Sequence, residues 1–169
     1  MIYCRFNLCK IMKDKKQNLI VGVGNILLTD DGIGIHLMNK LKEEESLKGN
    51  EFLDLGTSAM DIAYYLNNNI IRMVIIDCIK SDSDEPGTIF KMGVDDLVSK
   101  RKENFSLHQL ELIDSIKLAS VENDFPDTMV LGIVPKDIDT LSDRLSKEII
   151  DRLPFIYDRI LNLIKDFLK

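Results

Sequence analysis

Residues 21–34 read VGVGNILLTDDGIG: a short apolar run, a glycine-containing turn, and two adjacent carboxylates where a helix begins. The pattern predicts a buried first strand over residues 18–23 and a helix that starts near Gly32. In open α/β sheets, ligands bind beyond the carboxyl ends of the parallel strands. We therefore expect Asp30 and Asp31 to lie at a ligand-binding edge of a sheet.

A nucleotide is a poor candidate for that ligand. Gly22 and Gly24 fit the start of a G-x-G-x-x-G motif, but Leu27 stands where its third glycine is required. The adjacent Asp30 and Asp31 would repel a pyrophosphate and compete for the N–H groups of the helix N-terminus. No Gly-Lys-Ser/Thr sequence follows, so a P-loop is also disfavoured.

The aspartates also have a structural explanation. Asp30 or Thr29 is expected to cap the following helix, because aspartate and threonine are favoured N-caps and a carboxylate interacts well with the helix dipole. Two adjacent carboxylates exceed what a cap requires. One of them is then left to point into the crevice at the sheet edge.

The composition is typical of an ordinary globular protein. The chain has 169 residues, of which 45% are hydrophobic and 30% charged, and a net charge of −6. It has no basic stripe, so nucleic acid and anionic membranes are unexpected partners. No apolar run approaches the roughly 20 residues that span a bilayer. Three cysteines without a C-x-x-C motif fit a reducing cytosol, and we expect a cytoplasmic protein.

One domain is expected over residues 17–169, preceded by a peripheral extension at residues 1–16. The extension mixes basic and apolar residues and lacks the long apolar centre of a signal peptide. Met12 is an alternative start to Met1, because the first convincing strand begins only a few residues after it.

Apolar runs alternate with amphipathic segments along the chain. Strands are expected at residues 18–23, 52–55, 72–76, 88–92 and 128–134, and helices at residues 32–48, 57–66, 107–120 and 141–169. The strand at 88–92 has no crossover helix before it, so it should pair antiparallel. Pro154 should kink or split the last helix. The alternation predicts an α/β fold, a three-layer α/β/α sandwich with a mixed, mostly parallel sheet.

Two further residues can join the first carboxylates. Asp77 directly follows the apolar run 73–76 and should stand at the same sheet edge as Asp31, and His108 opens a later helix. An Asp/Asp/His set suits borderline divalent metals such as nickel, zinc or cadmium. Asp54, at the end of the second strand, is either a further site carboxylate or a turn residue.

Five short blocks, at residues 22–34, 54–57, 75–77, 86–88 and 108–109, occur in an order and spacing that resemble the hydrogenase maturation protease family. These endopeptidases process the large subunit of nickel–iron (NiFe) hydrogenases. The resemblance extends from about residue 19 to residue 168. The first block followed by the Asp77 and Pro-Gly-Thr blocks is a specific combination.

The resemblance implies a mixed-sheet, phosphorylase/hydrolase-like fold and a metal-sensing site formed by Asp31, Asp77 and His108. It implies that the protein removes a short C-terminal extension from a nickel-loaded NiFe hydrogenase large-subunit precursor. Nickel would arrive with the substrate, and zinc or cadmium could occupy the site of the isolated protein. The protein is expected to meet its substrate transiently, as a monomer.

The resemblance leaves the chemistry open. An aspartic-type mechanism would use Asp31 or Asp77 as the general base for water, whereas the rival account uses a metal-polarised carbonyl or metal-bound water. Cys78 stands where a small alanine is usual in the family. Two other function classes fit the same residues: a non-enzymatic, nickel-dependent hydrogenase assembly chaperone, and another metal-dependent amide hydrolase.

Overall fold

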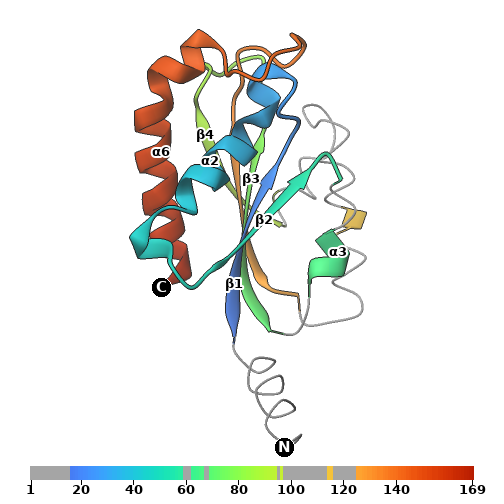
Figure 1. Cartoon of the computed structure of the whole chain (residues 1–169), viewed down its shortest axis with the longest axis vertical. Coiled ribbons are helices and arrows are strands. Elements are labelled where there is room, and N and C mark those ends of the chain that lie inside the picture. The colour runs from blue at the N-terminus through green and yellow to red at the C-terminus, as the bar shows by residue number, and fades with distance from the viewer. Residues whose placement is uncertain (1–15, 59–61, 67–68, 95, 97–113, 116–124) are drawn as a thin grey trace, which may run out of the picture.

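The structure is a computed structural model that describes residues 16–58, 62–66, 69–94, 96, 114–115 and 125–169. The described residues form a sheet with the strand order β2-β1-β3-β5-β4 (Figure 1). The strands are β1 (Gln17–Val23), β2 (Glu51–Gly56), β3 (Ile70–Cys78), β4 (Ile89–Gly93) and β5 (Asp127–Ile133). The first three strands and β5 are parallel, and β4 pairs antiparallel with β5. The predicted mixed, mostly parallel sheet is confirmed.

Helices cover both faces of this sheet (Figure 1). Helices α2 (Ile33–Leu41) and α6 (Lys147–Leu168) lie on one face, and α3 (Ile62–Tyr65) lies on the other. The 3-10 turns η1 (Thr29–Gly32) and η2 (Glu45–Leu47) flank α2. The arrangement agrees with the predicted α/β/α sandwich.

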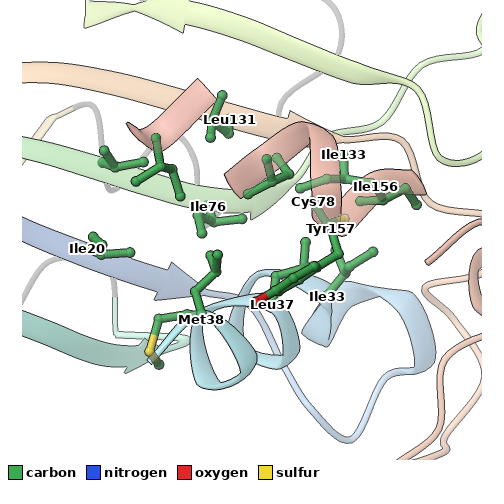
Figure 2. Close-up of a cluster of buried hydrophobic side chains, with 14 of the residues drawn as sticks. Ile20, Ile33, Leu37, Met38, Ile76, Cys78, Leu131, Ile133, Ile156 and Tyr157 are labelled. Carbon is green, nitrogen blue, oxygen red and sulfur yellow. The ribbon is translucent and has the colours of Figure 1, made fainter. Parts of the chain in front are cut away.

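Alternating side chains of β3 divide the core between the two faces of the sheet. Met73 and Ile75 join the cluster on the α3 side, whereas Val74, Ile76 and Cys78 join the cluster under α2 and α6 (Figure 2). A central parallel strand is buried on both faces, which explains its unbroken apolar sequence. By the same alternation, the side chain of Asp77 lies on the α3 side and that of Cys78 on the α2 side.

Glycines in the opening stretch let α2 begin directly over the ends of β1 and β3. A Cβ atom on Gly34 would lie 2.2 Å from the carbonyl oxygen of Ile76 and 2.4 Å from that of Val23. Gly24 has φ +131°, and a Cβ there would lie 1.9 Å from the carbonyl oxygen of Asp31. The glycines of this stretch therefore serve close backbone packing, which brings the two aspartates to the sheet edge.

The last helix differs from the prediction at its start. Residues 141–146 were expected to be helical, but α6 begins at Lys147. Ser142 instead pairs with the segment after β1: its N–H donates to the carbonyl of Leu27, and its carbonyl accepts from Thr29. The side chain of Ser146 then caps α6 by accepting from the N–H of Ile149.

Pro154 lies inside α6, which continues on both sides of it. The sequence predicted that the proline would kink or split this helix, and a split does not occur. A proline has no N–H, so Pro154 leaves the carbonyl of Ile150 without its helical donor. Both residues are exposed. Water can therefore satisfy that carbonyl, which lowers the cost of an interior proline.

Other differences are small or fall outside the described residues. The helix expected over 32–48 ends at Leu41 and is followed by η2. The helix expected over 107–120 is described only at residues 114–115, and the peripheral extension at 1–16 lies outside the description except for residue 16. Among the described residues, no helix is long and apolar enough to cross a membrane.

Candidate active site

Asp31 and Asp77 reach the carboxyl edge of the sheet from different elements. Asp31 belongs to η1, in the connection between β1 and α2, and Asp77 is the penultimate residue of β3. Both are buried, with exposed fractions of 9% and 4%. They occupy the place where open α/β sheets bind ligands.

Cys78 links these two carboxylates. Its thiol donates to Asp31 Oδ1 with a sulfur–oxygen distance of 3.7 Å, and its backbone N–H donates to Asp77 Oδ1 at 2.7 Å. The second oxygen of Asp31, Oδ2, accepts from the N–H of Asn25 at 2.9 Å. Both predicted carboxylates therefore hydrogen-bond Cys78, Asp31 through the thiol and Asp77 through the backbone N–H, and the Asp31 carboxylate is held from two sides.

The thiol of Cys78 is a donor and not a nucleophile. Burial raises the pKa of Cys78, and the nearby carboxylates of Asp77 and Asp31 raise it further, because each disfavours a thiolate. The neutral thiol keeps its proton and donates a hydrogen bond to Asp31. Cys78 therefore supplies no sulfur nucleophile at this edge.

Asp30 has a different role from its neighbour. Its side chain is fully buried and accepts four hydrogen bonds: from the backbone N–H groups of Lys136 (2.9 Å), Asp137 (3.0 Å) and Ser146 (2.7 Å), and from Ser146 Oγ (2.7 Å). This carboxylate fixes the segment between β5 and α6. All of these donors lie in residues 136–146, and Cys78 is not among them. Of the two adjacent aspartates, Asp31 is therefore the one that contacts Cys78 at the candidate site.

The predicted helix cap is wrong. Neither η1 nor α2 has a side-chain cap, and the N-cap of α2 is Gly32. Asp30 turns instead to the segment before α6, and the hydroxyl of Thr29 donates to the carbonyl of Thr140 at 2.6 Å. The side chains of Thr29 and Asp30 both hydrogen-bond a segment more than a hundred residues away in the sequence. Local sequence patterns do not reveal such partners.

Of the other two candidate residues, the structure describes Asp54 but not His108. Asp54 is exposed on β2, and its Oδ1 accepts from the N–H of Gly56 at 2.9 Å, which is the turn role that the sequence left open. His108 lies outside the described residues. Within the described part of the chain, no group of three or more His, Cys, Asp or Glu residues is placed to hold a metal. Asp31 and Asp77 supply two oxygen-donor side chains, and a third ligand would have to come from elsewhere.

Sequence reasoning missed the contribution of Cys78 and of the Asn25 peptide. A weak signal existed for Cys78: it follows Asp77 in an extended strand, so its side chain must face the opposite side of the sheet, where α2 packs. The N–H of Asn25 carried no signal in the sequence, because every residue except proline supplies one.

Comparison with known proteins identifies the family. Residues 35–163 match the hydrogenase maturation protease family. A hydrogenase 2 maturation protease of Escherichia coli K12 is 32% identical over 123 residues, which cover 72% of this chain and 74% of that protein.

Solved structures show the same architecture. The hydrogenase maturation protease HybD of Thermococcus kodakarensis has 32% identity and a TM-score of 0.73, over 87% of this chain and 98% of that one. The hydrogenase maturating endopeptidase HybD of Escherichia coli has 25% identity and a TM-score of 0.75, over 89% and 93%. With a family match over most of its length, a sheet of the same kind, and two carboxylates at its carboxyl edge, this chain belongs to the hydrogenase maturation protease family.

Proposed function

We propose that this protein is an endopeptidase that removes the C-terminal extension of a nickel-loaded NiFe hydrogenase large-subunit precursor. One observation carries the proposal: two buried carboxylates, Asp31 and Asp77, both hydrogen-bond Cys78 at the carboxyl edge of the sheet. Family membership supplies the class of reaction and the class of substrate. We expect the protein to work as a cytoplasmic monomer that meets the precursor transiently.

The proposal assigns nickel recognition to Asp31, Asp77 and His108. Carboxylate oxygen and imidazole nitrogen suit a borderline divalent ion, and the two carboxylates favour its positive charge. Nickel belongs to the substrate in this account and leaves with it. Zinc or cadmium would bind the same donors in the isolated protein.

Cleavage requires a water molecule to attack the scissile carbonyl. Asp31 or Asp77 is placed to act as the general base for this water, which is the aspartic-type account. The contacts from Asn25 and Cys78 fix the direction of the Asp31 carboxylate. In the rival account, the substrate's nickel polarises the carbonyl, and the same carboxylates only hold the ion.

The intact mass of the precursor tests this proposal. A nickel-loaded large-subunit precursor and a nickel-free sample are each incubated with the protein. Loss of a short C-terminal fragment from the nickel-loaded sample alone is the expected result. Binding without any mass change would instead indicate an assembly chaperone, and cleavage independent of nickel would refute the assignment of nickel recognition.

A further inference from the structure

Three exposed aliphatic side chains belong to two backbone-paired segments near Asp31. Ile26 and Leu27, in the turn after β1, are 45% and 55% exposed, and Leu141, before α6, is 78% exposed. Clustered exposed apolar side chains mark binding surfaces more often than scattered ones do. We call these three residues the apolar rim.

Backbone pairing places Leu27 next to Leu141. Leu28 and Ser142 form a parallel β-bridge, with hydrogen bonds from Ser142 N–H to the Leu27 carbonyl (2.9 Å) and from Thr29 N–H to the Ser142 carbonyl (3.0 Å). In a parallel pair, the residues that precede the paired ones are also neighbours. The backbones of Leu27 and Leu141 therefore lie next to each other, although 114 positions separate them in the sequence.

The rim is continuous with the Asp31 carboxylate. Asn25 holds Asp31 Oδ2 through its N–H, and its own side chain accepts from the N–H of Leu27 at 3.0 Å. On the other side of Asp31, a Cβ added to Gly32 would lie 2.7 Å from the Cα of Ile26. Ile26 and Leu27 are therefore next to the turn that holds Asp31.

The rim is also held in place before any partner binds. Asp30 fixes both ends of the segment that carries Leu141, through Lys136 and Ser146, and the Thr29 hydroxyl holds the carbonyl of Thr140. A surface that is already ordered loses little conformational entropy on binding. Asp30 therefore holds the segment that carries Leu141 in addition to stabilising the fold.

The peptide groups of Leu141 favour an extended partner. Ser142 directs both its N–H and its carbonyl toward the 27–29 segment. Successive peptide groups of an extended chain point in opposite directions, so those of Leu141 point away from that segment. An extended peptide can add to such an edge with main-chain hydrogen bonds while its side chains contact the leucines.

From these observations we infer that the apolar rim of Ile26, Leu27 and Leu141 binds an extended, apolar segment of the hydrogenase large-subunit precursor next to the scissile bond. This inference rests on the proposed function, because it takes the precursor as the occupant. It adds residues that determine substrate affinity and take no part in the chemistry.

A double variant with matched controls tests the rim. We expect L27S/L141S to raise the KM for the nickel-loaded precursor about tenfold, from the loss of buried apolar contact, and to leave kcat within about twofold. The conservative variant L27M/L141M should restore the KM. F155S removes a similarly exposed apolar side chain (66%) from α6 and should change neither constant. Equal melting temperatures of all variants exclude misfolding.

The outcomes separate this inference from the proposed function. If the wild-type protein cleaves the precursor and L27S/L141S keeps the wild-type KM, the rim is overturned and the protease activity stands. If the wild-type protein binds without cleaving, the affinity decides: a Kd weakened about tenfold in L27S/L141S supports the rim while the protease proposal falls. A wild-type dimer that L27S/L141S converts to monomers would overturn the inference in favour of a second copy of this chain.

Discussion

The thiol of Cys78 donates a hydrogen bond to the carboxylate of Asp31 across 3.7 Å, between the end of β3 and the turn that precedes α2. The same residue donates its backbone N–H to Asp77, so one position holds both candidate carboxylates. Catalytic carboxylates act only when they are correctly aimed, and this contact fixes the aim of Asp31.

The two carboxylates should be separately required for cleavage. Asp31→Asn and Asp77→Asn preserve side-chain size but remove the charge and the ability to take a proton, so each should lower the cleavage rate at least about 100-fold. The measurement is the fraction of nickel-loaded precursor that loses its C-terminal fragment over time, read as intact mass.

Asp54→Asn is the matched control for these variants. Asp54 is a carboxylate at the end of a neighbouring strand, but it is exposed, and its Oδ1 accepts from the N–H of Gly56 in its own turn. Its variant should cleave at the wild-type rate. A loss of activity in Asp54→Asn as large as in Asp31→Asn would contradict the assignment of the site.

Asp30→Asn should act on stability. Asparagine keeps one acceptor oxygen but turns an NH2 group toward buried donors that Asp30 now satisfies. We expect the free energy of unfolding to fall by about 2–4 kcal/mol, because hydrogen bonds to a buried charge are lost and donors are left unpaired. Urea denaturation gives the value, and an unchanged midpoint with an unchanged slope would refute the structural role of this carboxylate.

Close backbone packing should make Gly34 irreplaceable. Gly34→Ala places a methyl group within 2.4 Å of two backbone carbonyl oxygens, which cannot move away without disturbing β1 and β3. Its cost should exceed about 3 kcal/mol. Thermal unfolding of the purified variant, or its absence from the soluble fraction, is the readout.

Gly49→Ala provides the comparison for Gly34. Gly49 has φ +93°, and a Cβ there would meet no atom within 4 Å, so only backbone strain of about 1–2 kcal/mol is expected. Equal destabilisation of the two variants would show that the approach of α2 to the strand ends is looser than the structure indicates.

The buried Tyr157 of α6 should make stability depend on alkaline pH. Burial raises the pKa of Tyr157, and its hydrogen bond to Glu44 (2.5 Å) raises it further. A raised pKa means that the stability from Tyr157 is complete below its unfolded pKa, near 10.0, and is lost as the pH rises through the folded value. The free-energy advantage of the wild-type protein over Tyr157→Phe, about 1 kcal/mol at neutral pH, should shrink above pH 10. A difference that stays constant to pH 11 would contradict a raised pKa for Tyr157.

Much of the architecture was predictable because local patterns determine it. The run Met73–Ile76 is apolar at every position, as a strand buried on both faces must be, and the lack of a crossover before residue 88 predicted the antiparallel β4. These features depend on residues close in sequence or on the length of a connection.

The errors come from contacts between distant segments. Residues 141–146 have helical periodicity, but Ser142 pairs with the segment after β1, and Asp30 accepts from Ser146, 116 positions away. Asp30 and Asp31 are the same residue type at adjacent positions, so their different roles are decided by tertiary partners alone. Periodicity and capping preferences cannot distinguish such neighbours.

Nickel recognition by Asp31 and Asp77 is the central claim, and the affinity for two forms of the precursor tests it most directly. The Kd of the wild-type protein and of D31N/D77N is measured for the nickel-loaded and the nickel-free large-subunit precursor. We predict that the wild-type protein binds the nickel-loaded form more tightly and that D31N/D77N binds both forms equally. A D31N/D77N protein that keeps the full preference for the nickel-loaded precursor would contradict the account.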